Sequence, residues 1–471
     1  MAKLARSSGI QFGIQIVQTA IGFVAIVFLA RFLGSDTLGK YFLVMAVVSW
    51  LQIPCLSVHG AMSKRVSEGD EPDAFFTAGL ITLVTLCLLL SAVTLGAHQY
   101  IREYVGFPAT KFVVAIFFLN VVSTFMLAAL RSEQKLDIAS FYEGGWYILQ
   151  SLSQVGLAAA SVGLLSLLIG EIVAAVVTIA VAFYTVSLSI QRVSRDHFRS
   201  LYEFGKYTWA GAIKTRSFAW MDTIVLGFFV SASSVGIYEI AWRISALLIL
   251  LPSAMAKVSF PDMSQHASAG DLDRVEETLR RAITFAGLLA FPGVIGVSIL
   301  GTDVLRIYGP EFAAGFWILV ILATARIAQS FEILLMSAIN ALDKPDRSFR
   351  ISVLFIALNV TLNVLLVSRF DEVGAAVATV ISISVSAGMA YKIVASEIRL
   401  NVSHRSILSQ LVSAAVMGLS LVILRTVWLP ESSIGIVAQI IVAAGVYFSV
   451  VSLASSELRS LAFRIVAMRS E

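Results

Sequence analysis

The chain has 471 residues, of which 58% are hydrophobic and 14% are charged. A water-soluble domain is about half apolar and about a quarter charged, so this composition excludes an ordinary soluble fold and indicates a membrane protein. The formal net charge of +4 says little, because in a membrane protein the position of the charges matters more than their sum.

Apolar runs long enough to cross ~30 Å of hydrocarbon as helices follow one another along the chain. They predict an all-α polytopic membrane protein with about 14 transmembrane helices. Spans 5 and 6, and spans 11 and 12, are separated by little more than one turn, so their fusion is the main alternative to this count. The predicted spans are 10–32, 40–62, 74–96, 111–130, 141–163, 165–189, 206–230, 235–257, 281–301, 312–335, 348–368, 373–395, 406–427 and 433–455.

The distribution of basic residues predicts the orientation. With the N-terminus inside, the cytoplasmic segments hold 23 Lys and Arg and the outer segments hold 7. This asymmetry follows the positive-inside rule and predicts a multi-pass protein of the cell (plasma) membrane with both termini in the cytoplasm. The first run, preceded by Lys3 and Arg6, is interpreted as a retained span and not as a signal peptide. Cys55 and Cys87 lie within spans, which argues against a structural disulfide or a metal site.

A short loop occurs twice in the sequence. Gly39 and Tyr41 in RFLGSDTLGKYFLV are matched by Gly236 and Tyr238 in GFFVSASSVGIYEIA, 197 positions later. Each repeated unit contains six spans, an even number, so the sequence predicts a parallel repeat of the kind that builds two-lobed transporters. The predicted lobes are 1–200 and 201–400, followed by two additional helices and a short cytoplasmic tail in 401–471. Further matched pairs are Pro54 with Pro252, Arg102 and Tyr104 with Arg306 and Tyr308, and Lys135 and Phe141 with Lys344 and Phe349.

The stretch IQIVQTAIGFVAIVFLARFLGSDTLGKYFLV resembles the opening of polysaccharide-transporter family flippases. These belong to the multidrug/oligosaccharidyl-lipid/polysaccharide (MATE-like) exporter superfamily. The family's acid in span 7, Gly-x-Tyr loop and base in span 8 match Asp222, Gly236, Tyr238 and Arg243. The resemblance implies two six-helix lobes plus two helices, and movement of lipid-linked sugars from the cytoplasmic to the outer leaflet. Thr223 replaces the family's usual basic partner after the acid, which leaves any local ion pair at Asp222 in doubt.

Four cations fall inside predicted spans, all in the second lobe: Lys214, Arg216, Arg243 and Arg326. A charge at bilayer depth costs at least ~2.5–3.5 kcal/mol, so it normally faces a wet cavity or a partner. Arg can bind phosphate oxygens with a bidentate fork and Lys as a point charge, so we expect a cationic cavity for a polyprenyl- or dolichyl-(pyro)phosphate headgroup. Candidate sugar contacts are Trp220, Asn120 and Gln329.

Each of these cations also has a structural interpretation. Glu239 and Arg243 are four residues apart on one helix face and can neutralise each other. Lys214 can extend to the cytoplasmic surface. Arg216 can stack on Trp220, and Arg326 can pair with Glu332 or with a neighbouring helix.

Asp222 is the candidate for ion coupling, because an intramembrane carboxylate can bind H⁺ or Na⁺. No GxxxxGK[ST] loop is present, so we expect no ATP hydrolysis, and we expect no other cofactor, no metal site and no catalytic residue. The chain is therefore interpreted as a non-enzymatic flippase for cell-surface polysaccharide or glycan biosynthesis, working by alternating access.

Alternatives to this function remain. One is an ion-coupled multidrug and toxin antiporter, which the absence of a mid-depth acid in the first lobe disfavours. Another is a peptidoglycan lipid-precursor flippase. A membrane-embedded glycosyltransferase, polymerase or ligase is disfavoured by the short outer loops. The expected partners are a lipid-linked oligosaccharide and membrane lipids, with glycan-assembly enzymes as further candidates and no nucleic acid.

Overall fold

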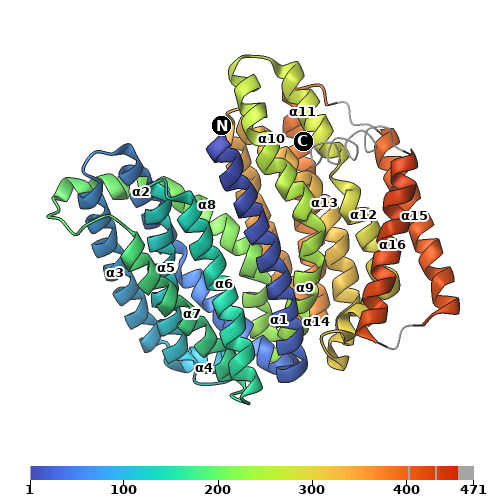
Figure 1. Cartoon of the computed structure of the whole chain (residues 1–471), viewed down its shortest axis with the longest axis horizontal. Helices are drawn as coiled ribbons and strands as arrows, with labels where there is room; N and C mark the ends of the chain where they lie inside the picture. The colour runs from blue at the N-terminus through green and yellow to red at the C-terminus, as the bar shows by residue number, and fades with distance from the viewer. Residues whose placement is uncertain (1, 401–403, 430–431, 455–471) are drawn as a thin grey trace. The chain divides into compact units, whose positions relative to one another are not determined.

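The computed structural model describes residues 2–400, 404–429 and 432–454; the side chains of 2–17, 19, 207–212 and 214–215 lie outside this description. Within these ranges the chain is helical and has no strand (Figure 1). The predicted all-α class is thereby confirmed. The helices are α1 (Ala2–Leu51), α2 (Ile53–Glu68), α3 (Pro72–Gly96), α4 (His98–Val105), α5 (Thr110–Ser132), α6 (Leu136–Ala159), α7 (Leu164–Thr185), α8 (Arg195–Phe229), α9 (Ala232–Ala246), η1 (Leu247–Ile249), α10 (Leu250–Ser268), α11 (Leu272–Thr284), α12 (Gly287–Arg306), η2 (Pro310–Gly315), α13 (Phe316–Ala341), α14 (Pro345–Glu397), α15 (His404–Val427) and α16 (Ser433–Ala454).

Ten helical segments of the described residues are long and apolar enough to cross a membrane, which makes this a multi-pass membrane protein. α6 and α8 are not among the ten, and both carry polar side chains such as Gln150 and Arg216. The ten segments are Ala20–Leu51, Pro72–Gly96, Thr110–Ser132, Leu164–Thr185, Ala232–Ser268, Leu272–Arg306, Pro310–Ala341, Pro345–Glu397, His404–Val427 and Ser433–Ala454.

Two of the long helices are interrupted by one non-helical residue. Gly34 in α1 has φ 77° and ψ 171°, and Asp371 in α14 has φ 50° and ψ −138°. Glycine tolerates positive φ, and Asp tolerates it better than most residues do. The predicted spans 11 and 12 therefore meet at Asp371, whereas spans 5 and 6 are the separate helices α6 and α7.

The repeated prolines occupy equivalent places. α1 ends at Leu51 and α2 begins at Ile53, with Pro54 in its first turn. α9 likewise ends at Ala246, and after η1 the helix α10 begins at Leu250, so that Pro252 lies in its first turn. Proline lacks the backbone N–H that a helix interior needs, but the first turn does not use this donor. In both copies of the repeat, the helix is therefore interrupted just before the matched proline.

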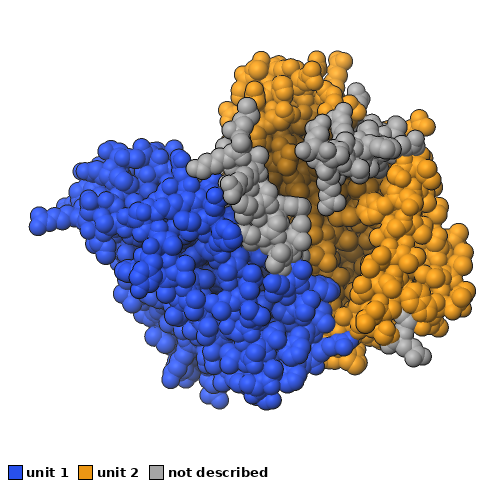
Figure 2. Space-filling view, in the orientation of Figure 1, with its two compact units in different colours: residues 1–236 blue, residues 237–471 orange. Residues whose placement is uncertain are grey.

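The chain forms two compact units, residues 1–236 (unit 1) and 237–471 (unit 2), coloured separately in Figure 2. In unit 1, α7 packs on α5 and α6, and α8 packs on α1 and α2. In unit 2, α13 packs on α10, α12 and α14. The division into lobes at 1–200, 201–400 and 401–471 stays a prediction.

The two copies of the repeated loop touch each other within unit 1. The Ser35 and Ser233 hydroxyls are hydrogen-bonded at 2.7 Å, and these residues are 198 positions apart in the chain. Corresponding segments of the two repeats therefore lie side by side where α1 bends and α9 begins.

Both cysteines are buried. Cys55 on α2 and Cys87 on α3 are each 0% exposed, and their thiols are free and hydrogen-bonded to each other. This contact lies where α2 packs on α3.

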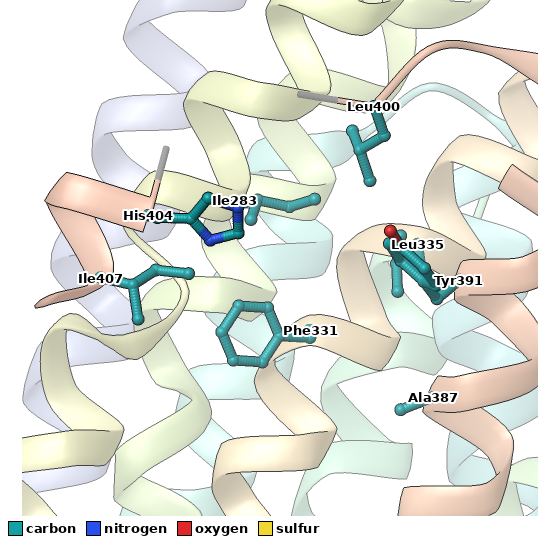
Figure 3. Close-up of a pocket in the computed structure, with 8 residues that line it drawn as sticks. All are labelled: Ile283, Phe331, Leu335, Ala387, Tyr391, Leu400, His404 and Ile407. Carbon is teal, nitrogen blue, oxygen red and sulfur yellow. The ribbon is translucent and has the colours of Figure 1, made fainter. Parts of the chain in front are cut away.

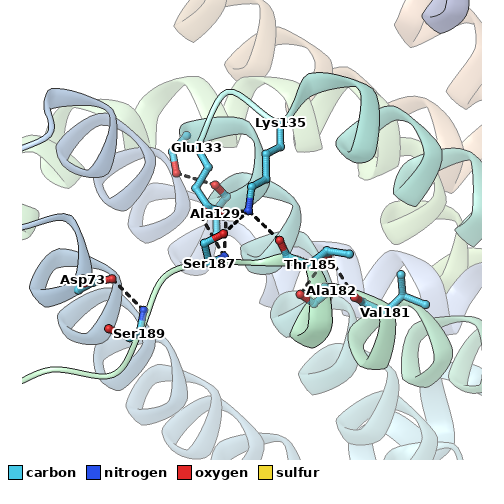
Figure 4. A network of polar contacts seen from close by, with 10 residues as sticks. Asp73, Ala129, Glu133, Lys135, Val181, Ala182, Thr185, Ser187 and Ser189 are labelled. Atoms are coloured by element: carbon cyan, nitrogen blue, oxygen red, sulfur yellow. Dashed lines mark hydrogen bonds and ion pairs between the residues drawn. The ribbon is translucent and has the colours of Figure 1, made fainter.

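Residues 186–194, between α7 and α8, are non-helical and are held by side chains of unit 1 (Figure 4). Glu133 accepts the backbone N–H of Ser187 at 3.0 Å, and Asp73 accepts that of Ser189 at 2.8 Å. The Lys135 ammonium donates to the Thr185 carbonyl at 2.8 Å. These hydrogen bonds satisfy backbone N–H and C=O groups that have no partner within a helix or strand.

Candidate functional site

Arg216 lies on α8 beside the interruption between α1 and α2. Its Nη2 donates to the Gln52 Oε1 at 3.1 Å, and the residue as a whole is partly exposed. Gln52 is the residue between the two helices and is itself buried. A single neutral amide leaves most of the five donors of a guanidinium available for other groups. The Arg216 guanidinium, which lies beside a helix interruption in unit 1, can therefore bind an anionic group.

Polar atoms near this interruption lack partners. The ring nitrogens Trp50 Nε1 and His59 Nε2 are buried and have no hydrogen-bond partner in the described part of the chain. Trp50 also lines an apolar pocket of about 320 Å³ with Leu51, Pro54 and three other residues: Val47, Leu90 and Ile224. Buried polar atoms without a hydrogen-bond partner are rare in native proteins, so this segment has capacity for a polar ligand.

Arg243 lies on α9 in unit 2 and is paired with Glu239. Its Nε is 3.8 Å from the Glu239 Oε2, at the i,i+4 spacing that suggested a pair from the sequence. The Arg243 side chain is 47% exposed, whereas that of Glu239 is 4% exposed. The guanidinium therefore keeps an open side while its charge is partly balanced by the buried carboxylate.

Arg326 lies on α13 and is 1% exposed. Its guanidinium carbon lies 4.0 Å from the centre of the Trp242 ring, its Nε donates to Ser245 Oγ at 3.2 Å, and its Nη1 donates to Gln329 Oε1 at 2.5 Å. This combination of a cation–π contact and charged hydrogen bonds joins α13 to α9. The contacts match the alternative in which Arg326 pairs with a neighbouring helix. Glu332, the other suggested partner, accepts a hydrogen bond from Ser386 at 3.1 Å.

The remaining candidates lie on α8 and on α5. Asp222 is 7% exposed and Trp220 is partly exposed. The Lys214 side chain lies outside the described residues. Asn120 on α5 is buried and donates to Glu171 Oε1 at 3.2 Å. The roles predicted for these residues in binding substrate or ions stay predictions.

Glu171 on α7 is a buried charge that the sequence analysis does not single out. It is 3% exposed, and its partners Asn120 and Gln150 lie about 15 and 14 Å from the nearer ends of α5 and α6, at ~1.5 Å per residue. Glu171 itself lies about 10 Å from the nearer end of α7, at ~1.5 Å per residue, so the expectation that the first lobe has no acid at mid-depth stays a prediction. The signal in the sequence was one Glu within the apolar run LLSLLIGEIVAAVV.

Unit 2 has a pocket of about 480 Å³ that is lined by residues of α11, α13, α14 and the start of α15 (Figure 3). Phe331, His404 and Tyr391 contribute rings to its wall, and its lining contains no Lys or Arg. It can hold a hydrocarbon group but offers no fixed cation to a phosphate. The lining residues are Ile283, Phe331, Leu335, Ala387, Tyr391, Leu400, His404 and Ile407.

Comparisons with known proteins identify the family of this chain. Residues 28–314 match the family described as "Polysaccharide biosynthesis protein". Because the match covers more than half of the chain, this protein belongs to that family. The family resemblance inferred from the span 1 and span 2 sequence is thereby confirmed.

Two relatives come from the archaeon Haloferax volcanii. One, "Probable flippase AglR", is 36% identical over 462 residues, which are 97% of each chain. The other, "Probable low-salt glycan biosynthesis flippase Agl15", is 29% identical over 394 residues, which are 81% of this chain and 82% of the relative.

The fold is also found in a solved flippase structure. The structure of "Lipid II flippase MurJ, inward closed conformation" matches with a TM-score of 0.80, over 94% of this chain and 98% of that chain, at 14% identity. At this identity the match establishes the fold alone, which is the predicted MATE-like exporter fold.

Proposed function

We propose that this protein is a flippase that moves a polyprenyl- or dolichyl-(pyro)phosphate-linked oligosaccharide from the cytoplasmic to the outer leaflet, for glycan or polysaccharide biosynthesis. The observation that carries the proposal is the 36% identity, over 97% of both chains, to a relative named as a probable flippase. Transport proceeds by alternating access, without covalent chemistry. The protein acts in the cell membrane with both termini in the cytoplasm.

The cations support an anionic headgroup as the transported group. Among the candidate cations whose side chains the structure describes, Arg216 and Arg243 are partly exposed, whereas Arg326 is buried against Trp242. Planar guanidinium groups bind phosphate oxygens through paired hydrogen bonds. We therefore assign headgroup binding to Arg216 and Arg243, and helix packing to Arg326. The apolar tail of the carrier can stay in the bilayer while its headgroup crosses.

The proposal is tested by headgroup translocation in proteoliposomes that contain a fluorescent polyprenyl-pyrophosphate oligosaccharide. Loss of a charged hydrogen bond costs about 1.5–3 kcal/mol, so Arg216→Ala and Arg243→Ala should each lower the rate about 10-fold or more. Arg102→Ala, which removes an exposed cation of α4, is the matched control and should leave the rate unchanged. Circular dichroism and thermal melting check that each variant is folded.

The same assay separates this function from its alternatives. Ion-driven efflux of organic cations, without translocation of any lipid-linked sugar, would favour the multidrug antiporter. Translocation of lipid II in preference to other carriers would favour the peptidoglycan-precursor flippase. A C-terminal reporter that is active only in the cytoplasm tests the orientation.

A further inference from the structure

The segment 186–194 of unit 1 is held through every second residue. Its alternate backbone N–H groups donate to side chains of α3 and of the end of α5. The pairs are Ser187 with Glu133 at 3.0 Å, Ser189 with Asp73 at 2.8 Å and Gln191 with Thr77 at 3.0 Å. Figure 4 shows the first two of these contacts along the segment. Backbone groups two residues apart face the same side in an extended strand, so this pattern indicates extended backbone.

The opposite side of the segment is unpaired. The backbone N–H and C=O groups of Leu188, Ile190 and Arg192 point away from the helices that hold the segment, because these groups alternate along an extended strand. They have no hydrogen-bond partner among the described residues. Ile190 is 78% exposed and Arg192 is exposed. A row of unpaired backbone groups on extended chain is the surface to which another strand adds.

Both ends of the segment are fixed, which keeps this row in place. At its start, the Lys135 ammonium donates to the Thr185 carbonyl at 2.8 Å. At its end, the Ser194 backbone N–H donates to His197 Nδ1 at 2.9 Å, and His197 Nε2 lies 2.8 Å from Glu71 Oε2. A surface that is already ordered loses less entropy when a partner binds to it.

The charges beside the row define the chemistry of the partner. Arg192 and Arg195 are exposed and form no ion pair among the described residues, whereas Asp196 lies in the first turn of α8. Other acids nearby are engaged: Glu133 with Lys135 at 3.2 Å, Glu71 with His197 at 2.8 Å and Glu203 with Arg199 at 3.1 Å. The local charge is therefore positive. It favours an acidic partner and disfavours a second copy of the same segment.

We infer that residues 186–192 form a docking site for an acidic peptide segment of another protein, which adds as a β-strand to the outward N–H and C=O groups of Leu188, Ile190 and Arg192. Main-chain hydrogen bonds supply the affinity, and the two arginines select negative charge. Strand addition does not depend on the proposed flippase function. The location of the partner in the cytoplasm rests on the proposed orientation.

Peptide binding is tested by fluorescence anisotropy on the purified full chain in nanodiscs of a neutral lipid. The probe is a short fluorescent peptide of alternating Glu and Val. The same peptide with methylated backbone nitrogens should bind about 10-fold more weakly, as expected for loss of one or two hydrogen bonds. A peptide of alternating Lys and Val should also bind more weakly. Absence of binding by the acidic peptide at millimolar concentration, or equal binding of any two peptides, overturns the inference.

A proline in the segment tests the outward row directly. Ile190→Pro removes one outward N–H, and its fixed φ is compatible with extended backbone. It leaves the N–H groups of Ser189 and Gln191 on their partners. We expect about 10-fold weaker binding of the acidic peptide, whereas Ile190→Val, which keeps the N–H, is the matched control and should bind like the wild type. Wild-type affinity in Ile190→Pro would contradict strand addition.

Two measurements keep the test independent of folding. Arg192→Gln leaves the backbone intact and should weaken binding of the acidic peptide a few-fold, with an unchanged melting temperature. In the wild type, hydrogen exchange at single-residue resolution should slow on peptide binding at Leu188, Ile190 and Arg192. Exchange at residues 187, 189 and 191 should change little, because their N–H groups are already bonded. Equal slowing at both sets, or at neither, rules out the proposed register.

Discussion

Gly39 and Gly236 make reciprocal close contacts in unit 1. A Cβ on Gly39 would lie 1.6 Å from the Ala232 carbonyl oxygen, and a Cβ on Gly236 would lie 2.1 Å from the Ser35 carbonyl oxygen. Gly39 and Gly236 are 197 positions apart, as are Ser35 and Ala232. Each copy of the repeated loop therefore uses its glycine to approach the backbone of the other copy, in a locally two-fold arrangement. The close approach of the two backbones therefore explains why both copies of the loop have glycine at this position.

The first prediction concerns these glycines. Gly39→Ala and Gly236→Ala should each destabilise the protein by about 1–3 kcal/mol, because the added methyl group overlaps a carbonyl oxygen. Thermal melting in detergent measures the effect. Gly22→Ala and Gly145→Ala are the controls, since a Cβ at either position meets no atom within 4 Å. Equal melting temperatures for the two sets would contradict the close approach.

A second prediction concerns Arg326. Arg326→Ala should lower stability by about 3 kcal/mol or more, because it leaves a cavity beside Trp242 and removes charged hydrogen bonds to Ser245 and Gln329. The control is Thr324→Ala, at an exposed position of the same helix. Denaturant unfolding followed by tryptophan fluorescence compares the two. A stable Arg326→Ala variant with impaired transport would instead point to a direct role in substrate binding.

The contact between Gln52 and Arg216 gives a third prediction. Gln52→Glu would place a carboxylate on the Arg216 guanidinium, where it competes with a phosphate. We expect it to lower headgroup transport about 10-fold, as for loss of one charged hydrogen bond, while Gln52→Ala has a smaller effect. Transport rates in proteoliposomes measure the difference. If Gln52→Glu raises the melting temperature and keeps full transport, Arg216 has a structural role only.

The segment 186–194 gives a fourth prediction. Asp73→Ala removes the acceptor of the Ser189 backbone N–H and of the Gln191 side chain. Loss of about 1 kcal/mol of local stability should speed amide exchange in this segment about fivefold. Hydrogen exchange with mass spectrometry measures it, with Asp70→Ala, at an exposed position just before α3, as the control. Unchanged exchange would mean that the other bonds in Figure 4 hold the segment without Asp73.

The sequence predicts the helices well because each span must supply an apolar run of membrane length. The matched Pro54 and Pro252 each lie in the first turn that follows a helix interruption, a position that suits proline because the first turn does not need its missing N–H. The pairing of Glu239 with Arg243 follows from helix geometry alone.

Contacts between distant helices are what the sequence cannot supply. Arg326 meets Trp242 and Ser245 only because α13 packs near α9, and spacing along the chain carries no such information. Glu171 is visible in the sequence as a charge in an apolar run, yet its significance depends on Asn120 and Gln150, which packing brings to it. A systematic search for acids in spans, applied equally to both lobes, would have found Glu171 but not its partners.

The two cysteines make the native protein a suitable background for site-directed labelling. Cys55 and Cys87 are the only cysteines of the chain, and both are completely buried between α2 and α3. A thiol reagent that reaches only accessible sulfur would leave them unmodified in the folded protein. A cysteine introduced at an exposed position could therefore carry a spectroscopic probe, and distances between probes in the two units could then be followed during transport without replacing a native residue.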